Sequence, residues 1–382
     1  MSPRAAPVFR LWLAVLLGNL AFGGSLQALP ELVVQRLHSG PVLLGFAVGL
    51  AFAATALSRP VAGYIADCGY SRRVVLAGSL LTAIGGIGQL LASNAAILLA
   101  ARVLMGVGDA ALFSGALPWV LAGTPEERRG RVASWFGLSM WSGLALGPVL
   151  ATLLQHWTGD DNAVWVLVIA LGAAAAVPVL TTARPPAPSQ ERPRWREIIP
   201  RGAARPGLVL WLASYGYGTV SAFAVLFLQE NHGSGETVPL TVFAAGYVLT
   251  RVAGGGLIDR FGGELVAGVS LLVELSGLAV VAVSASPLVT LVGLALAGIG
   301  TALVYPSTVI ITLKRGGLMR AGASVGALTS CWDLGVMAAG PLGGIFVAAF
   351  GYPVAFAVAA GSAGASALVV RWMITRRAVT AG

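Results

Sequence analysis

The sequence predicts an all-α membrane protein with about 12 transmembrane helices in two pseudo-symmetric six-helix bundles. Of its 382 residues, 57% are hydrophobic and 10% are charged, whereas soluble proteins carry about 25% charged residues. Apolar runs of about 20 residues, each long enough to cross a bilayer as a helix, recur along the whole chain. Several motifs of the first half also return in the second half.

Polar residues divide the chain into twelve predicted spans. The spans cover residues 8–33, 41–66, 74–91, 95–121, 132–154, 163–182, 208–228, 239–258, 265–283, 287–313, 321–349 and 353–374. The first span lacks a small-residue cleavage site, so we interpret it as a retained helix and not as a signal peptide. Residues 184–205 are rich in proline and arginine and have no apolar period. They are therefore the predicted linker between bundles at residues 1–183 and 206–382.

Basic residues fall almost entirely on one side of this topology. By the positive-inside rule that side is cytoplasmic, so we expect a multi-pass protein of the cell's inner (plasma) membrane with both termini and the linker in the cytoplasm. The net charge of +9 then reflects topology. Because the arginines are spread over every inner loop, we expect no nucleic-acid partner. We expect the lipid bilayer as surroundings and a monomer.

The internal repeat extends over three motifs at nearly one offset. The first motif is the triplet Arg59, Gly63 and Asp67, which aligns with Arg251, Gly255 and Asp259. The second is residues 105–113, which align with residues 297–305. The third is residues 143–148, which align with residues 335–341 after a slip of one residue. Two halves with one pattern in the same orientation imply a pseudo-two-fold axis along the membrane normal. That arrangement is expected of a transporter whose halves rock against each other.

These stretches resemble the major facilitator superfamily, and the resemblance covers the whole chain. GYIADCGYSRR (63–73) is similar to the family's loop between helices 2 and 3, although Cys68 replaces its usual basic residue. AARVLMGVGDAA (100–111) resembles the fourth-helix arginine motif of proton-coupled exporters, and GLALGP (143–148) resembles the fifth-helix motif of antiporters. The runs GIGTALVYP (298–306) and TSCWDLGVMAAGP (329–341) are similar to sugar-efflux-type exporters and to relatives that export opine-type metallophores.

The repeated loop motif predicts a pair of cytoplasmic gates. A carboxylate at the inner end of a helix can accept hydrogen bonds from a helix N-terminus and from guanidinium groups, and glycine lets backbones approach closely. The alternative is that these residues only set topology and form tight turns. The predicted gate residues are Gly63, Asp67, Arg72, Arg73, Arg128, Arg129, Arg131, Gly255, Asp259 and Arg260.

Ionisable residues within the spans are few, and each is a functional candidate by default. Asp333 on the eleventh span, beside a tryptophan, is the first choice for proton binding, and Asp109 is the second. Arg102 lies seven residues from Asp109, about 10 Å along the helix, so we expect the two to be coupled through water. A structural role is the alternative for Asp333. We expect Glu274 on the peripheral ninth span to have a structural or lipid-interface role.

Two further arginines, Arg59 and Arg251, lie near the cytoplasmic ends of their spans. We expect both to extend their guanidinium groups to the inner interface.

Polar and aromatic residues on other spans form a predicted substrate pocket. Aromatic rings with hydrogen-bonding tips suit sugars, amphipathic metabolites and cations, although aromatic residues in membrane helices also serve as interface anchors. The predicted pocket residues are Asn19, Gln27, Trp141, Tyr215, Tyr247, Tyr305 and Trp332.

The most specific function predicted is a proton-coupled exporter of a small organic molecule, namely a sugar, a drug-like metabolite or a metallophore. The chain has no GxxxxGK phosphate loop, so ATP is not the expected energy source, and we expect no enzyme activity, no cofactor and no metal site. One alternative is an importer or facilitator of a sugar or organic acid. Another is a membrane sensor or scaffold. The two gate motifs argue against a sensor or scaffold, which would have no need of them. The intramembrane acids argue against a facilitator, which needs no titrating carboxylate.

Overall fold

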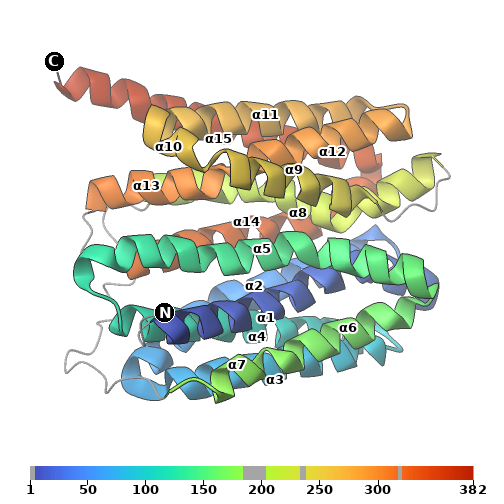
Figure 1. Cartoon of the computed structure of the whole chain (residues 1–382). Helices are drawn as coiled ribbons and strands as arrows, with labels where there is room; N and C mark the ends of the chain where they lie inside the picture. The colour runs from blue at the N-terminus through green and yellow to red at the C-terminus, as the bar shows by residue number, and fades with distance from the viewer. Residues whose placement is uncertain (1–4, 184–203, 233–237, 317–320, 382) are drawn as a thin grey trace. The chain divides into compact units, whose positions relative to one another are not determined.

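The computed structural model describes residues 5–183, 204–232, 238–316 and 321–381, and every regular element within them is a helix (Figure 1). The α-helices and two π-helical turns, η1 and η2, are α1 (Ala5–Glu31), η1 (Leu32–Arg36), α2 (Pro41–Ile65), η2 (Ala66–Tyr70), α3 (Ser71–Leu90), α4 (Ala95–Ala122), α5 (Glu126–Thr158), α6 (Asp161–Ala174), α7 (Ala176–Leu180), α8 (Ala204–His232), α9 (Pro239–Ala253), α10 (Gly255–Phe261), α11 (Gly263–Val283), α12 (Pro287–Ala302), α13 (Val304–Gly316), α14 (Ala321–Phe350) and α15 (Tyr352–Ala381).

These helices account for the predicted spans. Ten helical segments in the described part of the chain are long and apolar enough to cross a membrane. One of them, Pro41–Leu90, contains two predicted spans, and the shorter Pro239–Ala253 supplies another. The prediction of an all-α membrane protein is therefore confirmed.

The contacts divide the chain into two compact units. Unit 1 comprises Met1–Leu32, Leu50–Pro200 and Gly317–Ser330, and unit 2 comprises Val33–Gly49, Arg201–Gly316 and Cys331–Gly382. The predicted linker lies, apart from its last two residues, outside the described residues, so the bundle boundaries predicted there stay a prediction.

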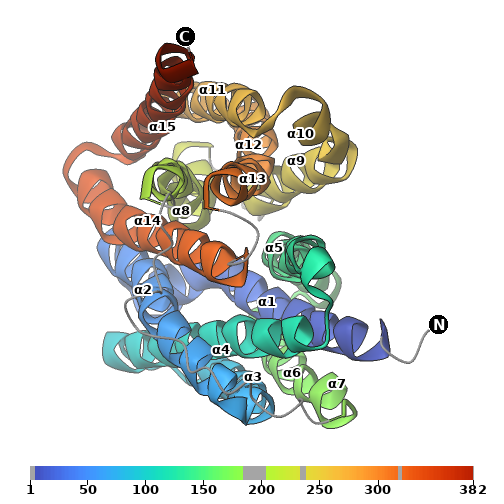
Figure 2. The same cartoon turned by 90° about the vertical axis from the view of Figure 1, so that its left-hand side faces the viewer.

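Each unit is held together by a few extensive helix contacts. In unit 1, α3 packs on α4, α1 packs on α5, and α6 packs on both α1 and α3. In unit 2, α11 lies against α12 and α15, and α8 contacts α15, α13 and α12 (Figure 2). The segment Ala204–Glu230 of α8 has the largest buried share of the candidate spans. The interior of unit 2 is therefore organised around α8.

The internal repeat is present in the helix crossings of both units. A Cβ atom added at Gly106 of α4 would collide with the carbonyl oxygen of Ala51 on α2. At the equivalent place in unit 2, a Cβ at Gly298 of α12 would collide with the carbonyl oxygen of Phe243 on α9. Glycine at both positions lets the two backbones touch, so α2 crosses α4 in the same register as α9 crosses α12.

Helix ends repeat as well. Asn94 caps the start of α4 by accepting a hydrogen bond from the Ile97 amide at 3.0 Å, and Ser286 caps α12 through the Val289 amide at 3.4 Å. Each cap satisfies a backbone donor that the helix leaves unpaired. The turns that end α5 and α14 each contain a left-handed glycine, Gly159 with φ 63° and Gly351 with φ 84°, a conformation that side chains with a Cβ disfavour.

We predict that the crossing of α2 and α4 does not tolerate a methyl group. Gly106→Ala should lower the free energy of unfolding by about 1–3 kcal/mol, because overpacking forces the backbones apart. Gly298→Ala should do the same in unit 2. The matched control is Gly137→Ala on α5, where an added Cβ meets no atom within 4 Å and helix propensity improves by up to about 1 kcal/mol. Thermal unfolding of the purified proteins in detergent measures the difference, and equal stabilities of the Gly106 and Gly137 variants would contradict it.

Candidate functional site

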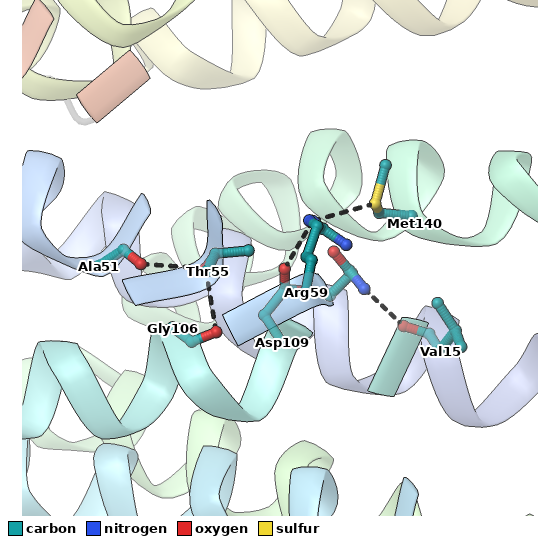
Figure 3. Close-up of polar contacts among 8 residues, drawn as sticks. Val15, Ala51, Thr55, Arg59, Gly106, Asp109 and Met140 are labelled. Atoms are coloured by element: carbon teal, nitrogen blue, oxygen red, sulfur yellow. Dashed lines mark hydrogen bonds and ion pairs between the residues drawn. The ribbon is translucent and has the colours of Figure 1, made fainter. Parts of the chain in front are cut away.

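A buried ion pair joins α2 to α4 in the interior of unit 1 (Figure 3). Nη2 of Arg59 lies 3.2 Å from Oδ2 of Asp109, and the two side chains are only 5% and 8% exposed. The same guanidinium lies 5.6 Å from the centroid of the Phe113 ring and 3.7 Å from the sulfur of Met140 on α5. Both charges are thus removed from water within a predicted membrane span, where an ionisable residue indicates a functional site.

The helix crossing positions this pair. The Thr55 hydroxyl on α2 lies 3.0 Å from both the Ala51 carbonyl of its own helix and the Gly106 carbonyl of α4. Arg59 follows Thr55 by one helical turn and Asp109 follows Gly106 by nearly one turn, and residues three and four apart share a helix face. The close contact at Gly106 therefore places Arg59 within reach of Asp109.

The contact between the two charges joins one nitrogen to one oxygen, Nη2 of Arg59 and Oδ2 of Asp109, at 3.2 Å. The Asn19 side chain of α1 lies near the same carboxylate. Because a proton can take the place of the guanidinium at this carboxylate, protonation of Asp109 would weaken the ion pair.

Arg102 is the residue that the sequence predicted to couple to Asp109. Its Nη1 donates to the Ser25 hydroxyl of α1 at 2.9 Å and to Oε1 of Gln89 on α3 at 3.4 Å, and its guanidinium lies 5.3 Å from the Phe22 ring. Arg102 is fully buried. Arg102 contacts α1 and α3, whereas Asp109 is paired with Arg59 of α2. The expected coupling of Arg102 to Asp109 through water stays a prediction.

The prediction that Arg59 reaches the inner interface is wrong, because Arg59 points inward to Asp109. Arg251, on α9 of unit 2, is partly buried and donates from Nη1 to the carbonyl oxygen of Ala302 on α12 at 2.8 Å, and its reach to the interface stays a prediction. Thr301 stands where the repeat has Asp109. Each arginine thus bonds across the same helix crossing, to a carboxylate in unit 1 and to a backbone carbonyl in unit 2.

All seven predicted pocket residues are buried. In unit 1, Asn19 on α1 donates its amide to the Val15 carbonyl at 3.0 Å and lies beside the ion pair, while Gln27 and Trp141 are buried on α1 and α5. Of these three, the structure brings only Asn19 to the Arg59–Asp109 pair.

An aromatic cluster forms in unit 2 around Tyr217 of α8. Its ring lies 5.5 Å from the Trp332 ring of α14 and 5.8 Å from the Phe243 ring of α9. Tyr215, the predicted pocket residue, is two positions away and so leaves α8 on nearly the opposite side. Its hydroxyl is buried without a hydrogen-bond partner. Trp332 therefore gathers with Tyr217, and Tyr215 does not join them.

The remaining predicted residues of unit 2 are buried on neighbouring helices. Tyr247 on α9 lies near Tyr217, and Tyr305 on α13 and Asp333 on α14 are 5% and 2% exposed. Asp333 directly follows Trp332 in the sequence. Unit 2 thus places a buried acid next to a residue of its aromatic cluster.

The predicted gate residues lie at the helix ends and are mostly exposed. Asp67 in η2 and Asp259 in α10 are exposed, as is Arg128. Arg72 donates to the carbonyl of Leu180 at 3.1 Å. The side chains of Arg129 and Arg131 and the surroundings of Gly255 lie outside the described part of the structure. The gate contacts of Asp67 and Asp259 therefore stay a prediction.

Two gate arginines stack on neighbouring rings. Arg73 lies 5.3 Å from the Tyr70 ring, and Arg260 lies 5.0 Å from the Phe261 ring. Gly63 does not act as a close-contact glycine, because a Cβ added there meets no atom within 4 Å. Gly106 on the fourth predicted span and Gly298 on the tenth are among the glycines that do allow backbone contact.

Sequence reasoning missed the partner of Asp109 and the position of Glu274. Glu274 is fully buried, and its carboxyl faces α8 inside unit 2, so the predicted lipid-interface role is wrong. The signal for Arg59 was present in the sequence, because Thr55 and Gly106 are small residues one turn from the two charges and mark a helix contact.

Comparisons with known proteins agree with this architecture. The profile of the Major Facilitator Superfamily matches residues 11–235 and 206–382. The uncharacterized MFS-type transporter STM4428 of Salmonella typhimurium is 33% identical over 380 residues, which cover 96% of each chain. The chain belongs to the Major Facilitator Superfamily, and its relatives indicate a membrane transporter rather than an enzyme.

Solved structures share the fold at low identity. The bacterial homologue of the human lysosomal transporter Spinster matches with a TM-score of 0.76 at 17% identity, covering 97% of this chain and 95% of that one. The Escherichia coli fucose:proton symporter FucP matches with a TM-score of 0.66 at 16% identity, covering 96% and 98%. Two six-helix bundles, as the sequence predicts, are typical of this fold.

We predict that Arg59 and Asp109 depend on each other for stability. Arg59→Met or Asp109→Leu alone should cost about 3–5 kcal/mol, because each leaves an uncompensated buried charge. The double variant should cost clearly less than the sum. Arg251→Met is the matched control, since it removes an arginine whose partner is a backbone carbonyl. A double-mutant cycle from unfolding in detergent measures the coupling, and additive costs would show that the pair does not interact.

Proposed function

We propose that this chain is a proton-coupled exporter of a small organic molecule that works by alternating access. The observation that carries the proposal is Asp109, a carboxylate buried in a membrane helix and paired with Arg59 at 3.2 Å. A proton and a guanidinium compete for the same carboxylate. Proton binding therefore breaks the ion pair, and the ion pair expels the proton.

This competition supplies the coupling. A carrier must load and release its proton within each cycle, so its charged form has to be favoured in one facing state and disfavoured in the other. The Arg59 contact stabilises the charged form of Asp109 wherever α2 and α4 keep their crossing at Gly106. A change in the position of Arg59 relative to α4 favours the proton. Coupling free energies of about 1–3 kcal/mol are enough for such a switch.

Asp333 is the proposed second carrier, in unit 2. It is buried on α14 beside Trp332, whose ring packs on Tyr217. We propose that the substrate contacts this aromatic cluster together with Tyr247 and Tyr305 of the same unit. Rings with polar tips fit a sugar, a drug-like metabolite or a metallophore, which are the proposed substrate classes.

The predicted gates complete the proposal. Asp67 and Asp259 lie at helix ends and are exposed in this arrangement. We propose that they close the cytoplasmic face through basic residues or helix N-termini when the outside is open. The termini and the linker are cytoplasmic in this scheme, and the protein lies in the bacterial inner membrane.

We predict that Asp109→Asn separates transport from coupling. Proteoliposomes with an acidic interior should accumulate substrate when they hold the unaltered protein, because outward proton flow drives an antiporter. A panel of labelled sugars, nucleosides and organic acids serves as probe. The variant should lose this accumulation but keep substrate counterflow, which needs no net proton movement. Asp333→Asn should behave in the same way if it shares the proton.

Asp160→Asn is the control for these variants. Asp160 caps α6 by accepting a hydrogen bond from the Asn162 amide at 2.9 Å, and asparagine caps equally well, so full accumulation is expected. Gradient-driven accumulation by Asp109→Asn would exclude it as the carrier. Accumulation driven by an acidic exterior instead of an acidic interior would favour the alternative, a proton-coupled importer.

The proposed orientation predicts one-sided cleavage of the linker. A protease site inserted within residues 184–205 should be cut in inverted vesicles and stay intact in whole cells, because the basic segment is retained in the cytoplasm. A second site placed between α5 and α6, after Gly159, should show the opposite pattern. Cutting of the linker site in whole cells would reverse the topology.

A further inference from the structure

Glu274 of α11 occupies a closed position inside unit 2. Its side chain is fully buried. Gly216 of α8 lies opposite, and a Cβ added there would be 2.7 Å from Oε1 of Glu274. On the other side, a Cβ at Gly300 of α12 would collide with the Glu274 backbone. The carboxyl is therefore enclosed where α8 and α12 meet α11, and glycines on both neighbours make room for it.

The Glu274 carboxyl has no positively charged partner among the described side chains. Neither carboxyl oxygen has a hydrogen-bond partner. The polar group beside the carboxyl is the Thr301 hydroxyl of α12, which donates to the Ala297 carbonyl at 2.8 Å. An ionised carboxylate in such a place is far more costly than a neutral one.

The charged and titratable groups on the helices around α11 do not supply a counter-charge. Arg371 of α15 directly follows Val370, and Val370 contacts α11 at Gly268. Gly268 lies about 9 Å from Glu274 along the axis of α11. Glu264 is about 15 Å away along the same helix. α12 has no ionisable residue, and the side chains of Lys314 and Arg315 on α13 lie outside the described set. The other titratable groups with described side chains on these elements are Arg205, Tyr215, Tyr217 and Glu230 on α8, Asp259 and Arg260 on α10, Tyr305 on α13 and Tyr352 on α15. The side chains of His232 on α8 and of Arg376 and Arg377 on α15 lie outside the described set.

The internal repeat gives Glu274 a counterpart. Thr82 of α3 stands at the equivalent position in unit 1, and its backbone meets Gly108 as the Glu274 backbone meets Gly300. Thr301 in turn is the equivalent of Asp109. Threonine and acid have thus exchanged places between the two units. Each unit keeps one buried acid on this helix pair, on α4 in unit 1 and on α11 in unit 2.

We propose that Glu274 is a further proton-binding site, distinct from Asp109 and Asp333, which holds a proton while α8 covers it and releases the proton when α8 moves away from α11. Ionisation needs water or a donor at the carboxyl, and Gly216 of α8 closes the side from which either would approach. The position of α8 therefore determines whether Glu274 is protonated or ionised. This role in transport rests on the proposed proton coupling, but the protonation itself is tested without substrate.

Infrared difference spectroscopy of the purified full-length protein tests the proposal. A protonated carboxyl has a carbonyl stretching band that an ionised one lacks. We expect a band at neutral pH that disappears as the pH is raised. Glu274→Gln, which matches the neutral acid in shape, should lack this band. Because ionisation leaves a charge without a partner, the unaltered protein should also lose thermal stability as the pH rises, and the variant should not.

Controls separate this site from other acids and from a structural role. Asp160→Asn should keep the band and the pH-dependent stability. Glu274→Met, similar in volume and without a proton to lose, should behave as Glu274→Gln and replaces it if the glutamine protein does not fold. If Glu274→Gln and Glu274→Met kept both the carbonyl band and the pH-dependent stability of the unaltered protein, the proposal would be overturned. Loss of the band with no transport of any probe would support the proton site while rejecting the proposed function.

Discussion

A guanidinium group in the hydrocarbon core needs a polar partner within its reach, and in unit 1 that reach is set by how closely α2 crosses α4. Gly106 allows the backbones to touch, and Thr55 fixes the crossing through two carbonyl oxygens. Arg59 and Asp109, each about one turn further on, then meet at 3.2 Å. A wider crossing would leave both charges without a partner in an apolar environment. The ion pair therefore depends on packing that involves no charge.

The two buried arginines of unit 1 have different surroundings and so suit different tasks. Arg102 is bound by neutral groups, a hydroxyl, an amide oxygen and an aromatic face. These three contacts do not depend on a proton, and they tie α4 to α1 and α3. Arg59 faces a carboxylate, whose charge a proton removes. Arg59 is therefore placed to respond to protonation of Asp109.

The sequence was sufficient for the features that depend on local composition and spacing. Apolar runs gave the spans, the repeated motifs gave the two related halves, and the scarcity of charge within the spans pointed to Asp109. The ion-pair partner of Asp109, Arg59, was not predicted, because helix spacing says which residues share a face but not which neighbouring helix that face meets. The same limit explains why the position of Glu274 was not predicted, since spacing does not show that its side of α11 faces α8. It also explains why Tyr215 was predicted for the pocket in place of Tyr217, whose ring packs on Trp332.

The two units of the chain can be compared with each other at this helix crossing. Unit 2 repeats the crossing of unit 1 with the acid of α4 replaced by Thr301, and there the equivalent arginine, Arg251, has turned to the Ala302 carbonyl. Both units have the arginine, but at this position only unit 1 has the acid. The same helix crossing therefore forms within one molecule with and without a charge pair. A permanent charge pair is not what holds such a crossing together, so the acid in unit 1 is available for another task.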